Sequence, residues 1–216
     1  MRNHLTLSVL AGLMLGLTAC SNSTSPTDSG LSLTTFSLSP GDILRFEETT
    51  TSSLGVDTSA FDDTVVNVSG ASGAQILVIG DDTLRMVNNA FIDNYPDTTV
   101  KTASFSASKG DVLSVWKDSF VDQFGNIEQT LTYTLSCKNP DTTITMPAGS
   151  FRVSASSYRA VSDKVGQDAI SMTGMLYFSP VYGQIGASLT VYSGHTPELG
   201  TVVVTSNTVL TSIIKK

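Results

Sequence analysis

The stretch that decides the fold is Ile170-Ser171-Met172-Thr173-Gly174-Met175-Leu176-Tyr177-Phe178. Its even positions hold apolar residues or glycine, and its odd positions hold serine, threonine, methionine and tyrosine, so the pattern has a period of two residues. Successive side chains of a β-strand point to opposite faces of the sheet. The even-numbered residues of this stretch therefore share one face, and the odd-numbered residues share the other. The segment 185–192 repeats the alternation, so both segments are predicted to be strands.

Similar runs occupy most of the chain after residue 30. They cover 44–51, 64–68, 75–79, 83–87, 100–107, 112–117, 151–159 and 201–213. Residues typical of turns separate them, at Ser39-Pro40-Gly41-Asp42, Gly80-Asp81-Asp82, Lys109-Gly110-Asp111, Gly125-Asn126, Asn139-Pro140-Asp141 and Pro147-Ala148-Gly149. Many short strands joined by such turns predict a single all-β antiparallel domain, with a strongly curved sheet that forms an open barrel or a sandwich. Helix is expected only as single turns at 58–63 or 88–94, and 118–125 is expected to be a loop or a hairpin tip.

The first twenty residues predict export. Arg2 begins a short basic region, and an almost uninterrupted apolar run covers 5–17. A membrane span needs about 20 apolar residues, so this run suits a signal peptide better. Leu17-Thr18-Ala19-Cys20 ends the run and resembles the lipobox of bacterial lipoproteins. The resemblance implies cleavage before Cys20, a diacylglyceryl group on its sulfur and an acyl chain on its new amino terminus.

These features divide the chain into a signal peptide (1–19), a lipidated flexible tether (20–30) and a β-domain (31–216). Several acyl chains anchor a protein stably, whereas one chain binds marginally. Ten tether residues span about 17 Å root-mean-square. The expected location is the bacterial cell envelope, and Ser21 after the cysteine resembles the pattern that sorts lipoproteins to the outer membrane, facing the periplasm or the exterior.

Three further motifs resemble those of uncharacterised bacterial envelope β-domains. They are Pro40-Gly41-Asp42-Ile43-Leu44-Arg45-Phe46, Met146-Pro147-Ala148-Gly149-Ser150-Phe151 and Tyr177-Phe178-Ser179-Pro180-Val181-Tyr182-Gly183-Gln184-Ile185. The resemblance implies a highly curved antiparallel sheet, and it supplies no activity and no functional residues. Residues such as Pro147 and Gly149 also have a mechanical explanation, since they form a tight turn that aims Phe151 inward.

The composition restricts the partners. The formal net charge is −7 over 216 residues, and only 14% of the residues are charged. A pI near 4.6 argues against nucleic acid as a partner and against charge-driven contact with an anionic membrane. The partners that remain are the membrane, through the lipid anchor, and an envelope protein or an apolar ligand.

Few side chains suit catalysis. After removal of the signal peptide His195 is the single histidine, in a predicted turn, and no Gly-x-Ser-x-Gly elbow accompanies it. Zinc requires three or four His, Cys or carboxylate ligands. Cys137 shares one strand face with Leu131, Tyr133 and Leu135, which predicts a buried and inert thiol. No catalytic, metal-binding or cofactor-binding residue is therefore predicted, and Cys20 is the one predicted site, for lipidation.

Aspartates form the remaining clusters. They are Asp62-Asp63, Asp81-Asp82, Asp93 with Asp97, and Asp118 with Asp122. Most are expected to form turns by binding their own backbone. Two alternatives stay open, a calcium site and a glycosidase-like pair of carboxylates.

Three functions follow from these features. The first is a non-enzymatic, membrane-anchored lipoprotein that binds a partner or supports an envelope assembly. The second is a half-barrel carrier of lipid or another apolar ligand, lined by the alternating apolar residues. The third, and least favoured, is a polysaccharide hydrolase that uses paired aspartates. Tyr158, Tyr177, Tyr182 and Tyr192 are expected either to line an apolar groove or to belt the sheet.

Overall fold

The computed structural model describes residues 35–71, 73–95, 98–121, 127–164, 169–196 and 200–216. In these ranges every regular secondary-structure element is a β-strand. The first six are β1 (Ile43–Ser52), β2 (Gly55–Ala71), β3 (Ala74–Ile79), β4 (Asp82–Val87), β5 (Ala90–Tyr95) and β6 (Thr98–Ser104). The last six are β7 (Val112–Val121), β8 (Ile127–Met146), β9 (Gly149–Ser162), β10 (Ser171–Ser179), β11 (Gly183–Thr196) and β12 (Gly200–Ile214).

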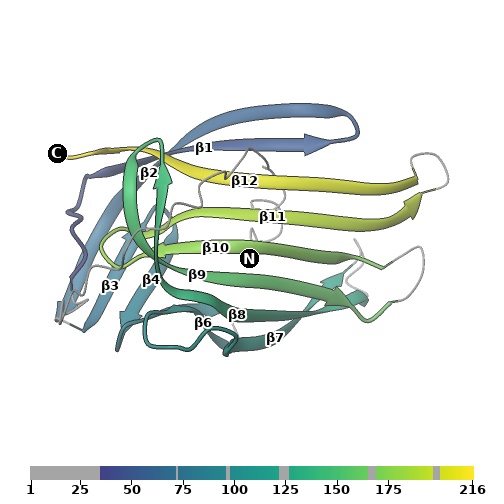
Figure 1. Cartoon of the computed structure of the whole chain (residues 1–216), viewed down its shortest axis with the longest axis horizontal. Coiled ribbons are helices and arrows are strands. Elements are labelled where there is room, and N and C mark those ends of the chain that lie inside the picture. Colours follow the sequence, from purple (N-terminus) through teal and green to yellow (C-terminus); the bar gives the residue numbers. More distant parts are fainter. Residues whose placement is uncertain (1–34, 72, 96–97, 122–126, 165–168, 197–199) are drawn as a thin grey trace.

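The strands form one antiparallel sheet in which almost every strand pairs with its neighbours in sequence. The order is β6-β5-β4-β3-β2-β1-β12-β11-β10-β9-β8-β7. Since β1 also pairs with β12, the sheet curls into a nearly closed barrel with one unsealed seam between β6 and β7 (Figure 1). Across that seam the Lys101 amide of β6 donates to Ser114 Oγ of β7 at 2.7 Å. The predicted all-β antiparallel domain is confirmed.

The two ends of the barrel differ. The strands β3 and β4 lie at one end of the barrel, at the left of Figure 1, and we call this the closed end. Its core joins both sides of the barrel, since Leu44 of β1 and Phe178 of β10 belong to one buried cluster with Leu77 of β3 and Phe91 of β5. The ring of Phe91 lies 5.2 Å from that of Phe178, centroid to centroid. We call the sheet face that carries Leu44 and Phe178 the inner face.

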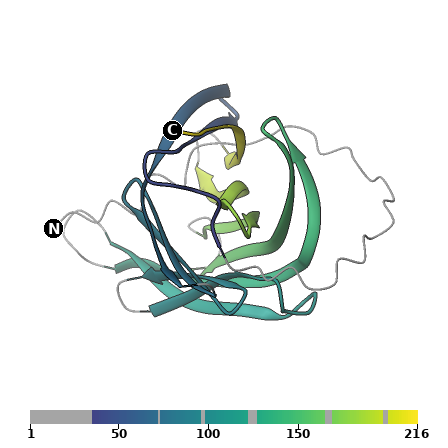
Figure 2. The ribbon, with the colours of Figure 1, turned by 90° about the vertical axis from the view of Figure 1, so that its left-hand side faces the viewer.

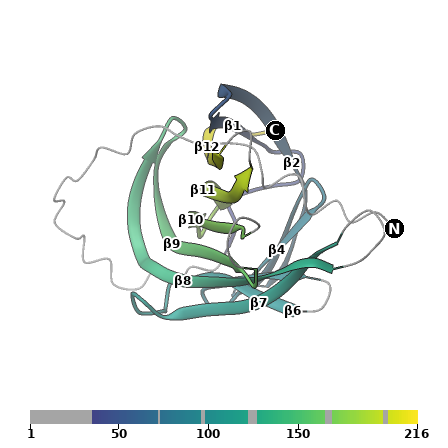
Figure 3. The same cartoon turned by 90° about the vertical axis from the view of Figure 1, so that its right-hand side faces the viewer.

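A bent hairpin covers the closed end from the other side. Residues 149–153 of β9 pair with β8 but not with β10, and the tip of the β8–β9 hairpin folds over the outer face of β10–β12 (Figures 2 and 3). The Ala148 amide donates to the Leu210 carbonyl at 3.3 Å. A Cβ added to Gly186 would lie 2.6 Å from Met146 Cε, so this position needs glycine for the hairpin to approach so closely.

The bend corrects one prediction. Asn139-Pro140-Asp141 is not a turn between strands, because β8 runs through it to Met146. The register against β9 shifts on both sides of Asn139, so these residues form bulges that bend a long strand. Proline is tolerated at such bulges because its nitrogen has no ladder bond to make. The bidentate ion pair of Arg152 with Asp141, at 2.7 Å, spans the bend.

Two other predictions were wrong. Neither 58–63 nor 88–94 contains a helical turn, since the first lies within β2 and the second holds the β4–β5 hairpin. Asn88 and Asn89 both have positive φ, 50° and 62°, which is the type I′ geometry of a two-residue hairpin. Of the segment 118–125, residues 118–121 belong to β7, and 122–126 lie outside the described residues.

The turn before β1 and the turn before β7 contain the same two hydrogen bonds. In Ser39-Pro40-Gly41-Asp42 the Asp42 amide donates to the Ser39 carbonyl at 3.0 Å, and the Ser39 amide donates to Asp42 Oδ2 at 2.8 Å. Ser108-Lys109-Gly110-Asp111 makes both bonds, at 3.1 and 2.8 Å. Both turns were predicted, at the starts of β1 and β7.

Only the first turn receives the carboxyl-terminal residues. Lys215 Nζ lies 2.8 Å from Asp42 Oδ2, and the Lys216 amide donates to Asp42 Oδ1 at 3.1 Å. The Lys215 ammonium, with the Ser39 amide next in importance, lowers the pKa of the buried Asp42 to about 2. This ion pair fastens the end of β12 to the beginning of β1, which secures the sealed side of the barrel.

Candidate binding face

Beyond the closed end, the inner face changes in chemistry from one side of the sheet to the other. Residues that pair directly across antiparallel strands share a face. The register therefore places one transverse row on the inner face, composed of Leu135, Tyr158, Gly174, Leu189, Ser206, Thr50 and Asp57. The members from β8–β11 are apolar, aromatic or glycine, and the members from β12, β1 and β2 are polar.

The apolar part forms a second buried cluster. Its members are Leu131, Tyr133, Ala160, Met172, Leu189 and Val191, with Trp116, Tyr158 and Ile170 packed against them. The rings of Trp116 and Tyr133 stack, with centroids 4.9 Å apart and planes 10° apart. Among the described residues, the strand members of this cluster come from β7–β11 alone, whereas the core of the closed end draws on both sides of the barrel.

The polar part carries acidic groups. Glu48 pairs with Thr208 on one side and with Ser59 on the other, which places it on the inner face. Partial burial raises the pKa of Glu48. Asp57 follows one row further along the hairpin, opposite Thr50. An apolar floor beside an acidic wall is the arrangement that would bind an amphiphile with an apolar body and an uncharged or cationic end.

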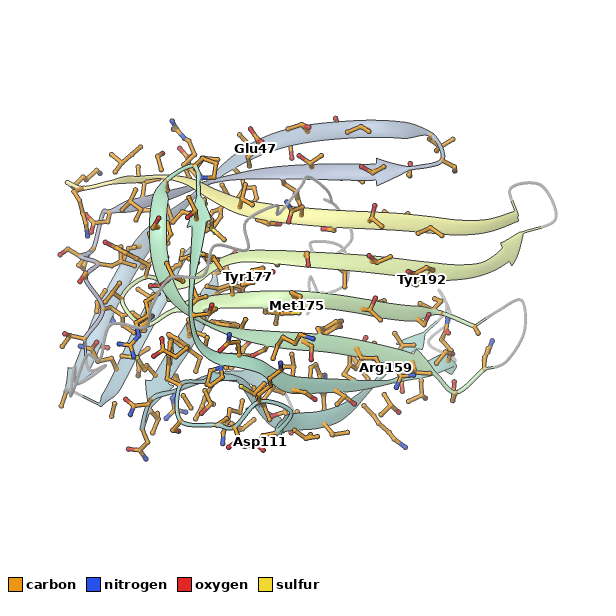
Figure 4. The ribbon with its side chains drawn as sticks, viewed as in Figure 1. Glu47, Asp111, Arg159, Met175, Tyr177 and Tyr192 are labelled. Carbon is orange, nitrogen blue, oxygen red and sulfur yellow. The ribbon has the colours of Figure 1, made fainter. Side chains whose placement is uncertain are left out.

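The outer face of the same strands differs from both parts. One of its rows consists of Thr134, Arg159, Thr173, Thr190, Thr205 and Thr51. Figure 4 labels other outer-face side chains, among them Glu47, Met175 and Tyr192. The threonine hydroxyl groups give this face a polar surface that faces water with few charged residues, which agrees with the low charged fraction of the chain.

The predicted site residues have different fates. Cys20 lies outside the described residues, so its lipidation stays a prediction. Cys137 is buried in β8, as predicted, and burial, with Asp111 contributing less, raises the pKa of its thiol. His195 lies at the end of β11, paired with Thr201, rather than in the predicted turn, and its side chain is outside the described part.

The tyrosines do not form one group. Tyr158 lies on the inner face within the aromatic cluster, whereas Tyr177 and Tyr192 lie on the outer face. Tyr182 contacts Phe151 beneath the β8–β9 hairpin, with ring centroids 5.7 Å apart. Of the two predictions for these tyrosines, an apolar groove and a belt around the sheet, only Tyr158 lies on the candidate binding face, while Tyr177 and Tyr192 lie on the outer face of the sheet.

Sequence reasoning did not single out Trp116. Its β-strand segment was predicted, and its alternation with Ser114 and Asp118 places all three on one face. What was missing is that β7 pairs with β8 so that Trp116 stands opposite Tyr133. That pairing depends on a bulge at Leu113, which shifts the register by one residue and cannot be read from alternation alone.

Two of the predicted aspartate clusters cannot be followed, because Asp97 and Asp122, the partners of Asp93 and Asp118, lie outside the described residues. In the other two clusters, Arg45 binds Asp62 through two bonds of 2.7 Å and lowers its pKa. The pKa values of Asp63 and Asp82 shift in the opposite direction. Burial is the main cause that raises both pKa values, and for Asp63 the charge of Asp82 adds to it.

That pair bears on the two alternatives left open for the acidic residues. Asp63 and Asp82 are the described carboxylates that come closest to the pair a hydrolase would need, and the clusters of Asp93 and Asp118 stay untested. Within the described ranges, no three His, Cys, Asp or Glu side chains come together in a way that would hold a metal ion. In the same ranges no helix is long and apolar enough to cross a membrane.

The fold resembles two solved structures. One is a protein inferred to be a lipoprotein from Parabacteroides distasonis ATCC 8503, which is 17% identical, with a TM-score of 0.51 over 82% of this chain and 97% of that one. The other is an exported protein with a YmcC-like fold from Bacteroides fragilis NCTC 9343, 12% identical, with a TM-score of 0.53 over 84% and 99%. No family model and no curated protein matches the sequence. At sequence identities this low, the comparison shows a shared fold and nothing further.

Proposed function

We propose that this protein is a non-enzymatic lipoprotein of the bacterial cell envelope, held to a membrane by acyl chains on Cys20, and that its β-domain binds a partner or ligand. The observation that carries the proposal is the export signal that ends in Leu17-Thr18-Ala19-Cys20 directly before a polar tether. Support comes from the two solved structures of similar fold, one described as a lipoprotein and the other as exported. The outer membrane is the proposed destination.

Replacement of the acylated residue tests this proposal. Wild-type protein should incorporate labelled palmitate and sediment with the outer membrane on a density gradient, because several acyl chains anchor stably. Cys20→Ser should lose the label and leave the outer membrane, whereas Cys137→Ser, the matched control, should keep both. Membrane attachment that survives Cys20→Ser would contradict the proposal.

A second function, carriage of an apolar ligand, is favoured by one observation. The cluster around Trp116 and Met172 covers one face of a single curved sheet, and no described residue of β2–β6 belongs to it. The apolar surface that Trp116, Tyr158 and Ile170 still expose would gain about 25 cal/mol for every Å² that a ligand removes from water. The adjacent acidic residues Glu48 and Asp57 favour an amphiphile whose polar end is uncharged or cationic.

Two methionines of β10 provide a matched test. Met172 is buried on the inner face, and Met175 lies on the outer face of the same strand (Figure 4). Native mass spectrometry of the purified protein should detect a bound amphiphile, and Met172→Gln should reduce its occupancy about tenfold because it places an amide against the apolar body. Met175→Gln should leave occupancy unchanged. Equal occupancy in both variants would exclude the inner face as the site.

A further inference from the structure

The outer half of β2 is an unpaired strand edge. β2 pairs with all ten residues of β1, from Ile43 opposite Thr64 to Ser52 opposite Gly55. Its pairing with β3 begins only at Val65. Along 55–64, the second edge of β2 therefore has no strand beside it among the described residues, and every residue from Gly55 to Asp62 is exposed.

This edge lacks several of the devices that usually protect one, and the protecting charges it has are all negative. Natural sheets protect their edges with charged side chains, especially lysine, with proline, with bulges or with a covering element. The segment 55–64 contains no lysine or proline, and its register against β1 is uninterrupted. The edge of β7 provides the contrast, because it carries Lys117 and two register shifts and is bridged by Ser114 to β6.

The hydrogen-bonding groups of this edge can be assigned from the register. The pair Ser52 and Gly55 closes a two-residue turn, and pairs along an antiparallel ladder alternate between hydrogen-bonded and non-hydrogen-bonded. Gly55, Asp57, Ser59 and Phe61 therefore bond to β1. The amides and carbonyls of the intervening residues, Val56, Thr58, Ala60 and Asp62, point away from β1 to the free edge.

The charge of the hairpin indicates what this edge would accept. β1 and β2 together carry Glu47, Glu48, Asp57, Asp62 and Asp63. Their single cation, Arg45, is already bound by Asp62 at 2.7 Å. A second copy of the hairpin would bring like charges together, whereas an extended segment rich in lysine or arginine would meet opposite charge. Two strongly exposed apolar side chains at the tip, Leu54 and Val56, add contact surface, at 89% and 68% exposure.

We propose that the free edge of β2 binds an extended basic segment of another protein as an added antiparallel or parallel strand. In this mode main-chain hydrogen bonds supply the affinity, and alternate side chains supply the specificity. The hydrogen-bonding groups of the site are backbone groups at the strand edge, and the site shares only the charges of Glu48 and Asp57 with the candidate binding face. It stands apart from lipid attachment and from ligand carriage, so its failure would leave both of those proposals intact.

A synthetic peptide tests the proposal on the full-length protein in non-ionic detergent. The probe is an eight-residue peptide that alternates lysine with valine and threonine. Its matched control carries N-methyl groups on two adjacent central residues, which removes one amide from each edge and keeps the charge. We expect saturable one-to-one binding of the probe by calorimetry, weakened about tenfold or more by N-methylation because hydrogen bonds are lost. Equal binding of both peptides would overturn the proposal.

The protein offers a second pair of variants. Ala60→Pro removes an outward-pointing amide without removing a bond to β1, and proline is accepted on edge strands. Ala60→Thr keeps the amide at the same position. Probe binding should weaken about tenfold or more in Ala60→Pro and stay within about twofold in Ala60→Thr. Unchanged binding in a folded Ala60→Pro variant, or a disulfide between two copies of Val56→Cys that the probe does not prevent, would overturn the assignment.

Discussion

The closed end and the candidate binding face lie on the same strands, yet they are built differently. At the closed end the inner face packs against β3–β6, and the outer face packs beneath the β8–β9 hairpin, so one buried cluster takes residues from three layers. On the binding face the apolar cluster takes strand residues from β7–β11 alone. The difference teaches that the first cluster joins several layers of the domain, whereas the second rests on one side of the barrel and leaves Trp116, Tyr158 and Ile170 only partly buried.

The largest expected effect is at the closed end. Phe91 is fully buried, and its ring contacts those of Phe36, Phe105 and Phe178. Phe91→Ala should lower the free energy of unfolding by about 3–5 kcal/mol, since it leaves a cavity that the surrounding layers cannot fill. Urea unfolding followed by circular dichroism provides the measurement.

The control for this prediction is Trp116→Ala on the binding face. It removes a larger ring from a side chain that is only partly buried, so it should cost about 1–2 kcal/mol. If Trp116→Ala lowered the free energy of unfolding as much as Phe91→Ala, both clusters would stabilise the fold equally, and the proposed difference between them would be wrong.

An intermediate effect is expected where the closed end is fastened. Asp42→Asn removes the charge that binds Lys215, while Asp111→Asn makes the same change in the matching turn without such a lysine. Asp42→Asn should therefore lower Tm by several degrees at pH 7, and Asp111→Asn should lower it less. Differential scanning calorimetry would compare the two, and equal shifts would show that the ion pair adds nothing to the turn.

The same carboxylate predicts a pH dependence. Its pKa in the folded protein, about 2, lies below the ordinary value of 3.8. Asp42 therefore contributes stability that is fully present above about pH 4 and is lost as the pH falls from 3.8 towards 2. The difference in Tm between wild type and Asp42→Asn should shrink over this interval, and a difference that stayed constant would argue against the ion pair.

The smallest effect concerns Cys137, which lies on the inner face in the row of Ser156, Leu176 and Ala187, between the two clusters. It is buried, and burial raises the pKa of its thiol. Alkylation at pH 8 should be negligible in the native protein and complete in urea, because the thiolate is the reactive form. Rapid native labelling would indicate that the middle of the barrel opens locally.

The sequence was sufficient to predict the fold class and most of the strands. Alternation identified eleven of the twelve described strands, with β5 missed, because one face of most of them is buried, and glycine and proline identified the turns around Gly41, Gly80 and Gly149. It failed where alternation carries no signal. The exposed first half of β2 has no buried face, so 58–63 was mistaken for a helical turn. At Asn139-Pro140-Asp141, turn-forming residues stand in a bulge instead.

The candidate binding face was predictable only in composition. Alternating apolar residues indicated that some face would be apolar, and Met172 was placed on the correct one. Which strands meet, and hence that Trp116 stacks on Tyr133 while Glu48 stands opposite Thr208, depends on register across strands far apart in sequence. The free edge of β2 was invisible for the same reason, since a strand reveals its partners only in the assembled sheet.

Trp116 makes the central claim directly measurable, because it is the single tryptophan of the chain and belongs to the apolar cluster of the binding face. Residues 21–216 would be titrated with lysophosphatidylcholine whose acyl chain carries bromine, a short-range quencher of indole fluorescence, and with the unbrominated lipid. Saturable quenching by the brominated lipid alone, weakened about tenfold in Met172→Gln and unchanged in Met175→Gln, is the predicted result. Fluorescence that the brominated lipid leaves unaltered, in a protein shown to be folded, would contradict the claim that this face binds an apolar ligand.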